Sequence, residues 1–68
     1  MKHVSGKKLV QIADEIGWVF VSQSGGHVKM RNPIDGKTII IPLHGNHDLR
    51  AGVQKQIMRT MGLTDADL

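Results

Sequence analysis

The sequence predicts an α+β fold in which two helices cover one face of a three-stranded antiparallel sheet. Three observations lead to this fold class. Apolar residues recur at helical spacing in two segments, one toward each end of the chain. Three short runs typical of strands lie between these segments: the first and third are mostly apolar, and the second alternates basic and apolar residues. Two close connections join the three runs, which implies an antiparallel meander.

The first helix is expected from Gly6 to Ile16. Ser5 is a suitable N-cap, and Gly17 stands where a left-handed residue ends a helix. The expected apolar stripe consists of Leu9, Ile12, Ala13 and Ile16. Such a stripe needs a sheet to pack against.

The three strands follow the first helix. They are expected at 18–21, 27–31 and 37–41, with a turn or loop at 22–26, a turn at 32–36 and Pro42 as the end of the third strand. The first and third strands are apolar at nearly every position, but the helices cover one face only. We therefore expect apolar side chains on the open face, where either a partner or long Lys and Arg stems cover them.

The second helix is expected from Leu49 or Arg50 to Met61, with Gly62 as its stop and Leu63 as the apolar contact beyond it. Its expected buried stripe consists of Leu49, Val53, Ile57 and Met61. In the loop before it, Asn46 or Asp48 is the expected cap. Thr64 is expected to begin one further helical turn.

Size and composition restrict the class of protein. The 68 residues form one expected domain, 1–68, without linker, repeat or low-complexity tract. There is no cysteine, so no disulfide or thiolate metal site stabilises the chain. No apolar run approaches the ~20 residues of a membrane span, and no apolar signal core follows the N-terminal charges. These features predict a cytoplasmic protein without a membrane partner.

The order helix, three strands, helix is also that of a double-stranded-RNA-binding domain, a module that reads RNA mainly by shape. The net charge of +3 mildly favours polyanions. Trp18 and Phe20 are the only aromatic residues, too few for a base-stacking platform. Any RNA contact is therefore expected through phosphates and shape.

Gly25-Gly26 places His27 at the head of a basic strand. Alternate residues of a strand share a face, so His27, Lys29 and Arg31 are expected on one side. An imidazole is available as acid and base near neutral pH, and RNA carries its own nucleophile in the 2′-hydroxyl. Adjacent glycines let a phosphate approach the backbone. The alternative is a tight turn followed by a strand with a solvated face.

A metal site is a weaker interpretation. His44 and His47 have a spacing that suits ligands on a helix, but they fall in a glycine- and asparagine-containing loop. Four ligands of a structural zinc site are hard to assemble from this chain. We therefore expect neither a metal nor a cofactor.

Several short motifs resemble those of the HicA (YcfA-like) toxins, small bacterial mRNA interferases of type II toxin–antitoxin pairs. They run in order over nearly the whole chain: Ser5-Gly6-Lys7, Gly17-Trp18, Gly25-x-His27, Asn32-Pro33-x-x-Gly36, Ile41-Pro42-x-His44, Leu49-x-x-Gly52 and Ile57-x-x-x-Met61-Gly62-Leu63. Each motif is short, and together at these spacings they are specific.

The resemblance implies a fold like a double-stranded-RNA-binding domain, ribonucleolytic cleavage of mRNA that arrests translation and growth, and a catalytic role for His27. It also implies a HicB-like antitoxin as the partner that blocks this histidine. Many members carry Gly-Ser-His where this chain has Gly25-Gly26-His27, and others carry Gly-Gly-His. The chain therefore lacks a hydroxyl that would bind phosphate or orient the imidazole.

Residues and resemblance together predict a metal-independent endoribonuclease with His27 as general acid/base. The expected phosphate-binding residues are Gly25, Gly26, Lys29 and Arg31, with Lys7, Lys8 and Lys37 as more distant RNA contacts. Two alternatives remain open: a non-catalytic RNA-binding module, and a small interaction protein whose open sheet face is a docking surface.

Overall fold

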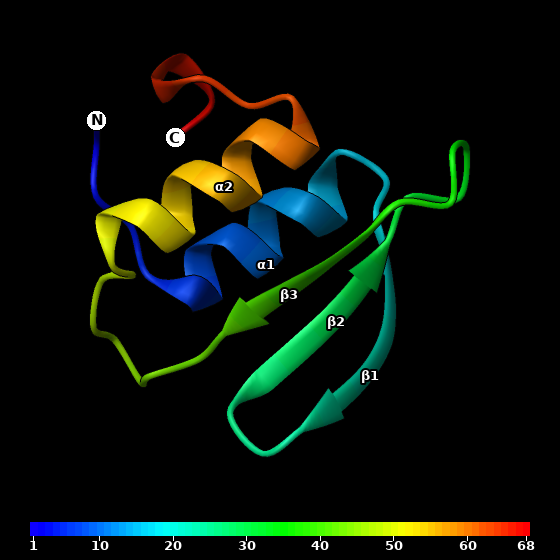
Figure 1. Cartoon of the computed structure of the whole chain (residues 1–68), viewed down its shortest axis with the longest axis horizontal. Coiled ribbons are helices and arrows are strands. Elements are labelled where there is room, and N and C mark those ends of the chain that lie inside the picture. The colour runs from blue at the N-terminus through cyan, green and yellow to red at the C-terminus, as the bar shows by residue number, and fades with distance from the viewer.

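A computed structural model describes residues 1–68 and confirms the predicted α+β layout, which is consistent with a fold like a double-stranded-RNA-binding domain. The elements are α1 (Gly6–Glu15), β1 (Val19–Ser24), β2 (His27–Arg31), β3 (Thr38–Pro42), α2 (Ala51–Met61) and a short 3₁₀ helix, η1 (Asp65–Asp67). The strands are antiparallel in the order β1-β2-β3. Both helices contact β3 and share one buried apolar cluster with the sheet (Figure 1). None of the helices is long and apolar enough to cross a membrane.

The core lies between the helices and the inner face of β2 and β3. Exposed and buried residues alternate along both strands, as expected for a sheet with one covered face. The inward side chains of these strands are Val28, Met30, Ile39 and Ile41. They belong to a single cluster of buried apolar residues that also includes Leu9 of α1 and Ile57 of α2. One core therefore joins the sheet to both helices.

The predicted ends of α1 are confirmed with one adjustment. The Ser5 hydroxyl accepts a hydrogen bond from the Lys8 N–H at 3.1 Å, so Ser5 caps the helix. Gly17 has a φ of +98°, a conformation that favours glycine. The helix ends at Glu15, however, and Ile16 is 49% exposed. The expected apolar stripe was therefore one residue too long.

The predicted buried stripe of α2 is confirmed at Leu49, Ile57 and Met61 and is wrong at Val53. The buried residues of the helix are Gln54, Ile57, Met58 and Met61. This is the i, i+3, i+4, i+7 spacing of a helical face that packs against a core. Val53, which was expected in the stripe, is 38% exposed. A polar residue, Gln54, replaces it, because the N-terminal segment of the chain supplies hydrogen-bonding partners there.

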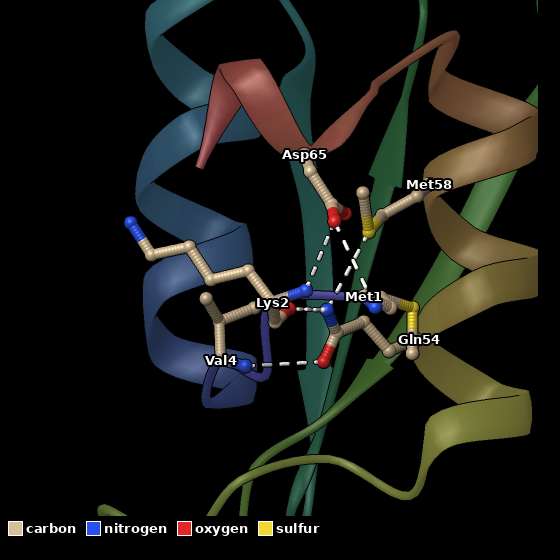
Figure 2. A network of polar contacts seen from close by, with 6 residues as sticks. All are labelled: Met1, Lys2, Val4, Gln54, Met58 and Asp65. Atoms are coloured by element: carbon tan, nitrogen blue, oxygen red, sulfur yellow. Dashed lines mark hydrogen bonds and ion pairs between the residues drawn. The ribbon is translucent and has the colours of Figure 1, made fainter.

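Gln54 fastens this N-terminal segment to α2 (Figure 2). Its Oε1 accepts a hydrogen bond from the Val4 N–H at 3.1 Å, and its Nε2 donates to the Lys2 carbonyl. Val4 also pairs with the chain before α2, where the Leu49 N–H donates to the Val4 carbonyl at 2.9 Å. The Asp65 carboxylate accepts from the Lys2 N–H. Residues 1–4 are thus held by hydrogen bonds to α2, to the segment just before it and to η1.

The first strand is longer than predicted. It runs through Ser24, and its turn contains only Gly25 and Gly26 instead of the expected 22–26. Polar residues fill its second half because β1 is an edge strand, exposed at all six positions. A register irregularity between Phe20 and Ser22 also interrupts its alternation.

The expected apolar side chains on the open part of the sheet are present. We call Val19, Phe20 and Val21 of β1 the apolar patch, and each is between 47% and 55% exposed. Ile40 of β3 is 48% exposed but is separated from this patch by β2. All six residues of β1 are exposed, so the helices leave most of this strand uncovered. A patch of this kind on a small protein is typical of a binding surface.

Candidate active site

The two glycines of the β1–β2 hairpin have different roles. Gly25 has a φ of +55° and Gly26 does not have a positive φ, which is the pattern of a type II′ hairpin turn. A Cβ on Gly26 would lie 3.0 Å from the Leu43 carbonyl oxygen. The Leu43 N–H donates a hydrogen bond to the Gly26 carbonyl, so the ladder between β2 and β3 continues past the strand end. Gly25 thus shapes the turn, and Gly26 permits close packing.

His27 is the first residue of β2 and lies on the open face of the sheet. It pairs with Ser24 on one side and with Pro42 on the other. The side-chain hydrogen bond at this turn joins Gln23 Nε2 to the Gly25 carbonyl at 3.5 Å and does not involve the histidine. The imidazole is exposed and is free of hydrogen bonds and ion pairs within the chain. The imidazole is therefore accessible to a ligand.

The prediction that His27, Lys29 and Arg31 share a face is confirmed, since all three are exposed while Val28 and Met30 are buried. Along an antiparallel strand the rise is about 3.4 Å per residue, which puts Lys29 about 7 Å and Arg31 about 14 Å from His27 between Cα atoms. Lys29 is close enough to contact a phosphate held at the imidazole. Arg31 is at the opposite end of β2.

The structure does not bring Arg31 and Lys37 to His27. Arg31 pairs with Thr38, the first residue of β3, and its Nη2 lies near the turn at Gly36. Lys37 directly precedes that strand, so these two cations lie together at the far end of the sheet. The expectation that Arg31 acts on the same phosphate as His27 does not fit this geometry. Contacts to other parts of an RNA chain are compatible with it.

Lys7 and Lys8 lie at the same end of the molecule as His27, because α1 begins against the end of β3. A Cβ on Gly6 would overlap the Pro42 carbonyl oxygen and lie 3.0 Å from its carbon, and Pro42 pairs with His27. Both lysines are exposed, and the first turn of α1 has no acidic residue. Cations at a helix N-terminus oppose the helix dipole. Their charge is therefore not explained by helix stability.

The loop between β3 and α2 differs from its predicted role. Neither Asn46 nor Asp48 caps α2: Arg50 occupies the N-cap and makes no capping hydrogen bond. The backbone of Asp48 instead forms a bridge with Ser5. No group of three His, Cys, Asp or Glu side chains comes together anywhere in the chain in a way that would hold a metal ion.

Sequence reasoning missed Gly6 and Gln54 as structural residues. The Ser5-Gly6-Lys7 motif was a signal for Gly6, but its reason is the contact with Pro42, which is distant in sequence. Gln54 has the right helical spacing from Ile57 and Met61 to lie on the same face. A search for apolar stripes passes over it because it is polar.

Comparison with known proteins identifies the family of the chain. No curated protein sequence matches the chain significantly. The family model described as the HicA toxin of bacterial toxin–antitoxin matches residues 6–63, which include both helices, the whole sheet and the His27 hairpin. The matched residues include Gly6 at the start of α1, the β1–β2 hairpin with His27, and Gly62 at the end of α2. Because the match covers most of the chain, the chain belongs to the HicA toxin family of bacterial toxin–antitoxin systems.

Proposed function

We propose that this chain is a metal-independent endoribonuclease that cleaves mRNA and thereby arrests translation and growth. The observation that carries the proposal is the exposed, unpaired imidazole of His27 beside Lys29 on an open sheet face. Family membership supports a toxin. The exposed cations at this end of the molecule, Lys7 and Lys8, support a polyanionic substrate.

The chemistry follows from the groups present. The His27 imidazole removes the proton of the 2′-hydroxyl, whose oxygen attacks the adjacent phosphorus. The bond from phosphorus to the 5′-oxygen breaks, which leaves a 2′,3′-cyclic phosphate and a 5′-hydroxyl end. The leaving oxygen takes a proton from water, from a lysine or from the imidazolium. Lys29 stabilises the negative charge that develops on the phosphoryl oxygens.

Gly25 and Gly26 contribute by keeping the hairpin bare. Neither carries a side chain above the turn, and a Cβ on Gly25 would meet no atom within 4 Å, so the space beside the turn is open. A phosphate can approach the backbone there more closely than over a bulkier residue. Since one histidine serves without a second positioned acid, we expect a slow enzyme.

The proposed partner is a HicB-like antitoxin. The family belongs to toxin–antitoxin pairs. The apolar patch on β1 is the candidate docking surface, because its three side chains are about half exposed and β1 has an unpaired edge. Val19 and Phe20 pair with Arg31 and Met30, at the end of β2 away from His27, so a protein docked there must extend along the sheet to block the histidine.

Induced expression in a bacterial host tests the proposal. Wild-type protein is expected to arrest growth and reduce full-length mRNA, and His27→Ala to abolish both effects. His3→Ala is the matched control, since His3 is also exposed but belongs to the N-terminal segment. Growth arrest that is equally strong with His27→Ala would contradict the proposal. RNA binding without any cleavage would favour the non-catalytic RNA-binding module instead.

A further inference from the structure

A pocket outside the hairpin lies between the end of β3 and the start of α2. Its volume is about 370 Å³, and Pro42 forms its wall toward the sheet. Its polar lining consists of His44, His47, Asp48 and Arg50. Pro42 is also the cross-strand partner of His27, and neighbouring strands are about 4.8 Å apart. The pocket therefore begins one strand away from the candidate catalytic histidine.

The lining of this pocket suits an anion. Arg50 is exposed and lacks a carboxylate partner, since the ion pair in the structure joins the N-terminal amine to Asp65. His44 and His47 add two imidazoles that donate hydrogen bonds. Asp48 is the one carboxylate and opposes the binding of an anion. A guanidinium binds phosphate through two parallel hydrogen bonds, which makes Arg50 the main anchor.

The position of Arg50 is not explained by the stability of α2. It occupies the N-cap, where Ser, Thr, Asp and Asn are preferred, and its side chain makes no capping hydrogen bond. The cations at the far end of the sheet, Arg31 and Lys37, are too distant to serve a substrate at His27 in its place. Arg50 thus stands near the candidate active site without an ion-pair partner, at a position where a capping residue would stabilise α2 better.

We propose that this pocket is a phosphate subsite, in which Arg50 with His44 and His47 holds a phosphodiester of the RNA chain that neighbours the scissile one. This inference rests on the proposed function, because it takes the scissile phosphate to be at His27. The bound RNA crosses the end of the sheet from the hairpin over Pro42 to the start of α2. The subsite contributes affinity and position, and no bond is made or broken there.

Binding of a fluorescent single-stranded oligoribonucleotide by the full-length protein tests the subsite. All variants are made in the His27→Ala protein so that cleavage does not disturb the measurement. Arg50→Gln is expected to weaken binding by about twofold to fivefold, the range for one exposed charge contact. The association constant falls as the salt concentration rises, and a plot of its logarithm against log salt has a negative slope. Arg50→Gln should make this slope less steep by about 0.7, the value for one phosphate of a single strand.

Arg59→Gln is the matched control, since Arg59 is an exposed arginine in the last turn of the same helix. It is expected to leave the Kd and the salt slope unchanged, and thermal unfolding of each variant verifies the fold. Asp48→Asn is expected to tighten binding, because it removes the opposing carboxylate. Equal effects of Arg50→Gln and Arg59→Gln, or no effect of Arg50→Gln, would overturn the subsite.

The two proposals fail separately in this design. Cleavage by the protein with His27 intact, combined with no effect of Arg50→Gln on binding, overturns the subsite and leaves the ribonuclease proposal standing. Arg50-dependent binding of RNA by a protein that does not cleave it supports the subsite as a binding site and overturns the ribonuclease. A His27→Ala protein that binds no RNA overturns the subsite outright.

Discussion

Replacing Gln54 tests how the N-terminal segment is attached to the fold. The side chain is fully buried and satisfies the Val4 N–H and the Lys2 carbonyl (Figure 2). Gln54→Ala leaves these groups without a partner, at about 1–3 kcal/mol for each that stays buried. Since the Lys2 contact is partly exposed, we expect a loss of about 2–4 kcal/mol in the free energy of unfolding.

This loss is large for so small a chain. A stability of about 0.05–0.15 kcal/mol per residue gives about 3–10 kcal/mol for 68 residues. In domains of this size Tm falls by about 4–8 °C per kcal/mol, so a decrease of at least about 8 °C is expected. Thermal and urea unfolding followed by circular dichroism measure both quantities.

Two further variants show whether lost hydrogen bonds or lost packing cause the destabilisation by Gln54→Ala. Gln56→Ala is the control, because Gln56 is exposed on the same helix, and it should change stability by no more than about 0.5 kcal/mol. Gln54→Leu fills the space but still leaves the Val4 N–H without its acceptor, and it is expected to destabilise by about 1–3 kcal/mol. A Gln54→Leu protein as stable as the wild type would refute the hydrogen-bonding argument.

Three other predictions concern the hairpin, the helix contact and the basic strand. Gly6→Ala forces α1 away from the Pro42 carbonyl and should destabilise the protein by about 1–3 kcal/mol in urea unfolding; an unchanged midpoint would contradict this contact. Gly25→Ala puts a side chain at positive φ and should lower stability by about 1 kcal/mol, measured as a Tm decrease of about 4–8 °C, whereas an unchanged Tm would argue against the turn. Lys29→Gln should reduce the rate of RNA cleavage by about tenfold or more, and Arg31→Gln far less, because Arg31 is at the far end of β2; equal losses in a single-turnover assay would contradict the geometry.

Much of the fold was predictable from local signals. Ser5, Gly17 and Gly62 mark helix ends through the conformations and hydrogen bonds that each residue favours, and each was assigned correctly. The strand period of two residues likewise put His27 and Lys29 on the open face. These features depend on residues close in sequence, which is why the sequence alone reveals them.

The remaining features depend on contacts between distant segments. The burial of Gln54 requires the backbone of residues 2–4, and the need for glycine at position 6 requires the end of β3. The separation of Arg31 from His27 was calculable from the rise along a strand, but its approach to the turn at Gly36 was not. Sequence patterns therefore located the candidate histidine. The tertiary structure was needed to tell which basic residues lie near it and which lie at the far end of the sheet.

The most direct test of the central claim is the cleavage of a defined oligoribonucleotide by purified protein in excess chelator, with the new ends identified by mass spectrometry. The account predicts 2′,3′-cyclic phosphate and 5′-hydroxyl ends, no cleavage by His27→Ala and normal cleavage by His3→Ala. It also predicts that a 2′-deoxy nucleotide at the cleaved position blocks the reaction, since the attacking oxygen is missing. Cleavage by His27→Ala at the wild-type rate, or complete loss of wild-type cleavage in chelator, would contradict it.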